Sequence, residues 1–283
     1  MITAKAKVNT MKCSDFAQEF ETMLRNKLVN LDSRIRSHVG ACKTCRKKFI
    51  AIRWEIAEGT RELKELKEFL GTGFNYGCDS SLELASDWNS KKRESTDSVL
   101  DFYQNTPWYI YNLTLWSACG QRPRYVEMAT KILKDHAVKS ILDFGAGVGT
   151  DALSFAASGF SVETYEINRL CSLFLEWKRY RQNLQIIMHT ESATIIKEFD
   201  LLWCMDTIEH LKYPIEALSP FLKKCRFFVY DTEFSGNSGG FHPFHFQHDE
   251  DELQKGWQDL GFIQIENLKT ETSFKVFERK SRD

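Results

Sequence analysis

From about residue 139 onward, short apolar runs alternate with longer helical patterns, and this alternation constrains the fold more than any other feature. "KSILDFG" (139–145) and "FSVETYEI" (160–167) carry the β-branched and aromatic residues of strands, and "GTDALSFAASG" between them has helical spacing. Seven strand-like runs are predicted, at residues 139–145, 160–167, 184–189, 200–206, 226–231, 262–268 and 272–280. Strands separated by helices pair in parallel through right-handed crossovers, so we expect an α/β fold with a doubly wound, seven-stranded Rossmann-like sheet.

The N-terminal part of the chain has a different pattern. Residues 49–70, "FIAIRWEIAEGTRELKELKEFL", space their apolar residues along one helical face and predict one long amphipathic helix. Glycines in "GTGFNYG" end it, and a polar stretch follows. We therefore expect a small all-α domain (1–75), a linker (76–98) and the α/β domain (99–283).

Composition narrows the cellular setting. The net charge is -1, which gives no overall signature of a polyanion-binding protein. No apolar run approaches the roughly 18–20 residues of a membrane helix, and the N-terminus lacks the apolar core of a secretory signal. We expect a cytoplasmic protein without a membrane segment. Its eight cysteines would then be reduced, and clustered ones would be metal ligands.

The loop after the first predicted strand is where a ligand binds in such sheets. It reads "DFGAGVG", with Gly145, Gly147 and Gly149 at alternate positions. A dinucleotide loop has its third glycine one place later, where this chain has Thr150, so the spacing argues against NAD. The second predicted strand ends at Glu166, whose carboxylate could accept two hydrogen bonds from a ribose diol.

On these residues the chain resembles the class I S-adenosylmethionine (SAM)-dependent methyltransferases, whose first motif is D/E-x-G-x-G-x-G. The resemblance spans residues 141–280. It implies that Gly145 and Gly147 approach the methionine part of SAM, that Asp143 lies near its amino group, and that Glu166 binds the ribose. The expected cofactor-binding residues are Asp143, Gly145, Gly147, Gly149, Glu166, Ile167, Glu191, Met205 and Tyr103.

Two points remain open in this assignment. Glu191 or Ser192 would lie near the adenine, but "HTESATIIKEF" departs from the usual G-D-A form of that motif. The alternative for the whole loop is that the glycines only tighten a turn and that Glu166 is a surface acid.

The segment "FDLLWCMDTIEHLKYP" (199–214) resembles the fourth motif of the same family. It places Asp206, Glu209 and His210 at the end of the fourth strand, near the expected position of the sulfonium methyl. Histidine is the natural general base near neutral pH, so His210 is the first catalytic candidate, with Glu209 as its orienting partner or as a contact of the cofactor loop. The alternative is that Glu-His-Leu only shapes this loop.

Histidines recur after the fifth strand, in "SGGFHPFHFQHDE", where the Gly/Ser stretch is typical of a mobile lid. Together with His245, the D-x-x-E-H sequence resembles the metal site of small-RNA 3′-end 2′-O-methyltransferases, with Asp206 in place of their first glutamate. The catalytic candidates are therefore Asp206, Glu209, His210 and His245. This second resemblance implies that they hold a divalent cation that activates a hydroxyl. The alternative is that no metal binds, because a histidine before the last helix is also common in relatives without one.

Six aromatic residues lie between residues 102 and 116. By analogy with the family, residues 99–135 form a helical cap over the cofactor, with Tyr103, Tyr109 or Tyr111 near the sulfonium or the substrate. Cation–π attraction to a sulfonium contributes about 0.5–2 kcal/mol. Core packing is the alternative for each of these aromatic side chains.

Near the N-terminus, "HVGACKTC" supplies His38, Cys42 and Cys45, and Cys13 lies upstream. Residues 11–50 resemble the zinc-binding anti-sigma-factor domain, which implies one structural zinc held by these four side chains. A redox C-x-x-C motif is the alternative, but it would not explain His38.

The surrounding segment is strongly basic. Nine Arg or Lys residues and one acid lie between Arg25 and Arg53. This surface could bind an acidic protein, a nucleic acid or an acidic leader peptide, or it could be a solvated face with no partner. We expect a SAM-dependent methyltransferase acting on a small-molecule or peptide acceptor, with O-methylation preferred and a zinc module for recruitment. The alternatives are a metal-dependent RNA 2′-O-methyltransferase and a regulatory binding protein with a degenerate methyltransferase fold.

Overall fold

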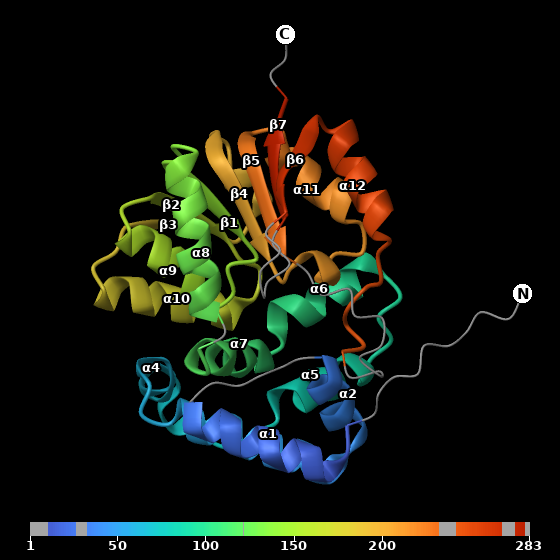
Figure 1. Ribbon diagram of the computed structural model, residues 1–283. Coiled ribbons are helices and arrows are strands. Elements are labelled where there is room, and N and C mark those ends of the chain that lie inside the picture. Colours follow the sequence, from blue (N-terminus) through green and yellow to red (C-terminus); the bar gives the residue numbers. More distant parts are fainter. Residues whose placement is uncertain (1–10, 27–32, 121, 232–241, 268–274, 281–283) are drawn as a thin grey trace, which may run out of the picture.

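The computed structural model describes residues 11–26, 33–120, 122–231, 242–267 and 275–280. Its main body is a seven-stranded sheet with helices on both faces, in the order β3-β2-β1-β4-β5-β7-β6 (Figure 1). The strands are β1 (Ser140–Phe144), β2 (Ser161–Tyr165), β3 (Ile186–His189), β4 (Phe199–Met205), β5 (Cys225–Asp231), β6 (Phe262–Asn267) and β7 (Lys275–Arg279). The predicted α/β class and the seven strands are confirmed.

Not all strands run parallel. β1 to β5 pair in parallel, but β7 is antiparallel to both β5 and β6. No helix separates β6 from β7 in the sequence pattern, and a connection as short as residues 268–274 joins antiparallel strands. The sheet is therefore mixed, with its parallel part around β1.

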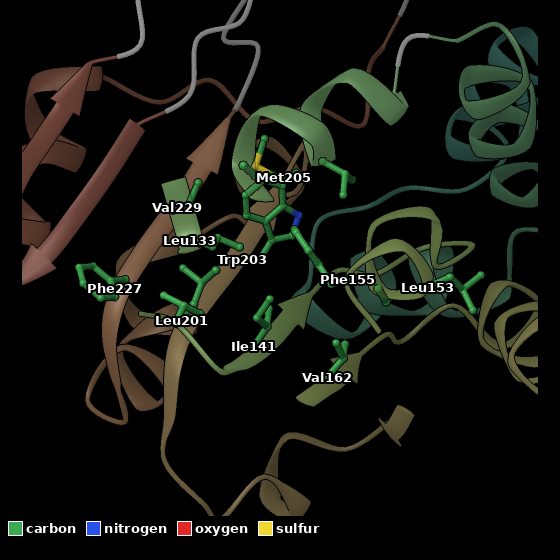
Figure 2. Packing of buried hydrophobic residues seen from close by; sticks show 14 of the residues in the cluster. Leu133, Ile141, Leu153, Phe155, Val162, Leu201, Trp203, Met205, Phe227 and Val229 are labelled. Atoms are coloured by element: carbon green, nitrogen blue, oxygen red, sulfur yellow. The ribbon is translucent and has the colours of Figure 1, made fainter. Parts of the chain in front are cut away.

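Alternating side chains of each strand enter two separate cores. Ile141 packs under α8 (Arg122–Asp135), α9 (Thr150–Ala157) and α10 (Arg169–Arg181), whereas Leu142 packs under α11 (Pro214–Leu222) and α12 (Glu250–Asp259). This is the period of two that a strand buried on both faces requires. Trp203 of β4 is fully buried in the first core, and Figure 2 shows its ring surrounded by apolar side chains from neighbouring strands and helices.

Of the eight α-helices that precede the sheet in the described part of the chain, the first seven lie beyond the carboxyl ends of its parallel strands (Figure 1). They are α1 (Cys13–Asn26), α2 (Ser33–Ala41), α3 (Lys43–Ala57), α4 (Arg61–Leu70), α5 (Ser80–Asn89), α6 (Thr96–Asn105) and α7 (Trp108–Ala118). Among the helices that the structure describes, none combines the length and apolarity needed to cross a membrane.

The prediction of one helix over residues 49–70 is wrong. The chain leaves α3 at Gly59, which has a φ of 81°, and Thr60 then caps α4 by accepting a hydrogen bond from the Leu63 amide. A left-handed glycine followed by a capping threonine is a break between two helices. The apolar periodicity continues across the break, which is why the pattern concealed it.

The predicted linker, residues 76–98, is also structured. It contains α5, whose Leu84 is only 1% exposed, and the carbonyl of Cys78 accepts a hydrogen bond from Trp54 Nε1 at 3.0 Å. Trp54 and Leu66 pack in one cluster with Ile110 of α7 and side chains from the glycine loop and α10. The N-terminal helices therefore share a core with the α/β part.

Candidate active site

The loop between β1 and α9 has a backbone that only glycine adopts without strain. Gly145, Gly147 and Gly149 have φ values of 77°, 54° and 76°. A Cβ on Gly147 would lie 2.6 Å from Leu113 Cδ1 of α7. Helix α7 therefore lies directly against the bare backbone of the glycine loop.

Glu166 lies directly across this loop. Its Oε2 accepts a hydrogen bond from the Gly147 amide at 2.6 Å, and its Oε1 accepts one from the Asn168 amide at 2.6 Å. Burial raises the pKa of this carboxyl, and the backbone donors act in the opposite direction. Each carboxylate oxygen keeps further lone pairs, so Glu166 can still accept bonds from a ligand.

Asn168 is a site residue that sequence reasoning missed. Its side-chain amide donates to the carbonyls of Tyr103 at 2.8 Å and Thr106 at 2.9 Å. It also caps α10 through the Cys171 amide. One side chain therefore connects the end of β2 to the aromatic helices above it, and the Asn at this capping position was the available sequence signal.

A cavity of about 990 Å³ opens at the carboxyl ends of β1, β2 and β4. The predicted residues on its wall are Tyr103, Gly145, Gly147, Glu166, Ile167, Met205, Asp206, Glu209, His210 and His245. Three predicted residues, Asp143, Gly149 and Glu191, are described but do not line it. Ser192 of the short helix η2 (Ser192–Thr194) lines it in place of Glu191.

Asp143 lies behind the wall, 3% exposed, with its Oδ2 lacking a hydrogen-bond partner. Burial, followed by the negative charge of Asp151, raises its pKa well above the usual range. This environment favours the neutral carboxyl.

Arg122, at the start of α8, is a second residue that the motifs did not reveal. Its guanidinium donates to Asp151 Oδ2 at 2.7 Å and to Asp206 Oδ2 at 2.5 Å. Asp151 also accepts a hydrogen bond from Trp203 Nε1 at 2.7 Å. Asp206 has a φ of 49°, a conformation uncommon outside glycine. The Arg122 pairing therefore holds Asp206 at the cavity wall.

The histidines form a compact group on the same wall. His210, in the short helix η3 (Ile208–His210), has its ring centroid 4.6 Å from that of His245. One ligand atom each of Glu209, His210 and His245 lies within 4.8 Å of the other two. Asp206 is not a member of this group, so the expected four-residue metal set is corrected to three.

Burial, and then His245 and His242, lower the pKa of His210 well below its usual value. Its Nδ1 is buried without a hydrogen-bond partner. The lowered pKa favours the neutral ring, which is the state a general base needs.

Two tyrosines of the aromatic segment flank His210. The ring centroids of Tyr103 and Tyr109 lie 5.4 Å and 5.8 Å from that of His210. The Tyr103 hydroxyl donates to the Phe244 carbonyl at 2.5 Å, and burial raises the pKa of both phenols. These are uncharged aromatic faces. The Gly/Ser stretch expected as a lid lies at residues 232–241, outside the described residues.

A family model described as a methyltransferase domain matches residues 120–271, more than half of the chain. The chain belongs to this methyltransferase family. A SAM-dependent methyltransferase from Clostridium acetobutylicum covers 61% of this chain and 99% of its own, with 10% identity and a TM-score of 0.50. Magnesium protoporphyrin IX methyltransferase from Synechocystis with bound SAM aligns over 73% of this chain and 100% of its own length, with 16% identity and a TM-score of 0.48. No curated protein matches.

The four candidate zinc ligands of this chain lie outside the matched residues, but they lie together. Ligand atoms of Cys13, His38, Cys42 and Cys45 are all within 4.8 Å of one another, and the Cys13 and Cys42 sulfurs are 3.8 Å apart. Atoms about 2.3 Å from a tetrahedral zinc lie about 3.8 Å apart. His38 Nε2 is buried without a hydrogen-bond partner, as an open ligand position would be. The donor set and geometry fit zinc.

The basic segment between Arg25 and Arg53 is not one uniform charged face. Arg46 forms a two-bond ion pair with Asp79, and Arg53 is buried at 5% exposure. Residues 27–32 lie outside the described residues. The binding of a protein or nucleic acid here stays a prediction.

Proposed function

We propose that this protein transfers the methyl group of SAM to a small-molecule or peptide acceptor, with a hydroxyl oxygen as the preferred target. The observation that supports this most strongly is the pairing of the bare Gly145–Gly149 backbone with Glu166 at the mouth of the cavity. The glycine loop lets a ligand contact its backbone directly, and the carboxylate supplies strong acceptors for a ribose diol.

His210 would be the base for an oxygen acceptor. As the oxygen–methyl bond forms and the methyl–sulfur bond breaks, the hydroxyl proton would pass to the His210 ring, which lines the cavity. The low pKa of His210 keeps the ring neutral before transfer. The aromatic rings of Tyr103 and Tyr109 would face the sulfonium cation.

A methyl-transfer assay tests this proposal. The protein would be incubated with methyl-labelled SAM and pools of metabolites, peptides and RNA. We expect label in a small-molecule or peptide fraction, and a large loss of label transfer in His210→Asn. No transfer to any pool, combined with no SAM binding, would contradict the proposal.

A metal-dependent RNA 2′-O-methyltransferase is the second candidate, and the Glu209, His210 and His245 group favours it. One carboxylate and two imidazoles suit a divalent cation that activates a hydroxyl. Methylation of RNA 3′ ends that is lost on dialysis against a chelator, restored by Mn²⁺ and absent in Glu209→Gln would establish it. Transfer to a non-RNA acceptor without added metal would exclude it.

We also propose that Cys13, His38, Cys42 and Cys45 hold one structural zinc ion, and that the helices around it recruit an acceptor or a partner protein. Metal binding would supply folding free energy to a segment whose own core is small. Zinc content of the purified protein tests the first part, and co-purification of a partner with wild type but not with a Cys42→Ser variant tests the second.

A further inference from the structure

The cavity extends past the glycine loop toward the N-terminal helices. Four residues at that end define what we call the Arg53 recess: Arg53 of α3, Ser81 of α5, and Asn112 and Trp116 of α7. Asn112 and Trp116 are four residues apart and therefore share one face of α7. Arg53 Nη2 reaches the Asn112 carbonyl at a long 3.5 Å, which places its guanidinium beside that face.

Within the described ranges of the chain, Arg53 is a buried charge without a counter-ion. Its residue exposure is 5%, its Nε has no hydrogen-bond partner, and none of the residues that the structure describes forms an ion pair with it. The other two arginines on the cavity wall differ, because Arg46 pairs with Asp79 and Arg122 pairs with two aspartates. A buried guanidinium is normally paired, so Arg53 lacks the anion that its position requires.

Trp116 supplies a second donor at the same end of the cavity. Its Nε1 is buried and has no hydrogen-bond partner. An indole N–H and a guanidinium can only donate, so a ligand group that bonds to either of them must be an acceptor. The planar fork of a guanidinium matches a carboxylate or phosphate best.

We propose that the Arg53 recess binds the anionic group of a small molecule held in this cavity. The inference rests on the proposed function for the identity of that molecule. The anionic group has two candidate sources with the same chemistry: the α-carboxylate of SAM, or an acid group on the acceptor. An acceptor of this kind has an apolar body along Phe49, Ile50 and Leu84 and its acid group at Arg53.

Three variants separate these possibilities. Arg53→Met removes the charge at similar volume, Arg53→Lys keeps the charge without the fork, and Arg46→Met is the control on the same helix. Each is titrated with SAM by calorimetry. Each is also titrated with two fluorescent probes, 8-anilinonaphthalene-1-sulfonate and the neutral N-phenyl-1-naphthylamine, which share their rings but not the sulfonate. Urea unfolding reports the stability of the ligand-free chain.

We expect Arg53→Met to lose at least tenfold in affinity for SAM or for the sulfonate, with the neutral probe unchanged and Arg53→Lys intermediate. A loss of affinity for SAM would assign the Arg53 recess to the methyl donor. A loss of affinity for the sulfonate probe would assign it to the methyl acceptor. The ligand-free Arg53→Met chain should be at least as stable as wild type, whereas Arg46→Met leaves Asp79 unpaired and should be less stable.

Unchanged affinity for both anions would overturn the proposal. Equal loss of the anionic and neutral probes together with reduced stability would also overturn it, because Arg53 would then be structural. If SAM does not bind wild type, the proposed function fails, but the comparison of the two probes still tests the recess.

Discussion

Glu166 Oε2 accepts a hydrogen bond from the backbone N–H of Gly147 at 2.6 Å, so the end of β2 is bonded directly to the glycine loop. Asn168 donates its own backbone N–H to the other carboxylate oxygen. Both oxygens therefore face N–H donors and still have lone pairs toward the cavity. The loop, the acid and the cavity form one unit, and the predictions below test its parts.

Glu166→Gln should weaken SAM binding at least tenfold, or about 1.4 kcal/mol. The amide NH₂ replaces one acceptor oxygen and would point at a backbone N–H, and the charge that strengthens the ribose bonds is lost. Calorimetric titration measures the change. Glu163→Gln is the matched control, because Glu163 is buried on the same strand but binds His189 at 2.7 Å and does not line the cavity. Wild-type affinity in Glu166→Gln would remove the ribose assignment.

Gly147→Ala should destabilise the protein by about 1–3 kcal/mol, since it combines a left-handed backbone with overpacking. Its Cβ would lie 2.6 Å from Leu113 Cδ1. Gly159→Ala is the control, with a φ of 91° and nothing within 4 Å. Urea unfolding should show a larger loss for Gly147→Ala, part of which Leu113→Ala restores. Equal losses would show that α7 does not press on the loop.

Stability should fall as the pH drops below about 6.5, the ordinary histidine value. His210 is buried neutral with a lowered pKa, so between its native pKa and 6.5 the unfolded chain binds more protons than the folded one. Above 6.5 both states are neutral and this contribution is constant. Thermal unfolding of wild type and His210→Asn from pH 5 to 8 measures it. A pH dependence that is the same in both proteins would place the effect elsewhere.

The purified protein should contain one zinc ion per chain, and Cys42→Ser should release it. Three remaining ligands leave the tetrahedral site open. Metal analysis by mass spectrometry is the measurement, and Cys225→Ser, a buried cysteine outside the cluster, is the control. A wild-type protein without zinc would end the metal interpretation of His38.

Local patterns predicted the central strands well because β1, β4 and β5 are buried on both faces and read as nearly continuous apolar runs. Ile141 and Leu142 illustrate this, since adjacent residues enter opposite cores. The break at Gly59 was missed because apolar spacing keeps its phase from α3 into α4. The helix α5 was missed because its many polar residues resemble a linker, although Leu84 is buried.

The sequence motifs located only part of the site. The residues that they missed act through contacts with residues far away in the sequence. The motifs located Gly147, Glu166 and His210 because each lies in the loop that begins where a strand ends. Arg122 was missed because its partner Asp206 is 84 residues away, and a single sequence does not encode such a pairing in any local spacing. Arg53 was counted in a basic segment, and only the fold shows that it is buried on a cavity wall.

The central claim is that the glycine loop and Glu166 form a SAM site, and equilibrium titration of the wild-type protein with SAM and with NAD⁺ tests it most directly. The account predicts saturable, one-to-one SAM binding and no detectable NAD⁺ binding. Binding of NAD⁺ in preference to SAM, or of neither ligand, would contradict it and leave a protein that uses a methyltransferase fold for another purpose.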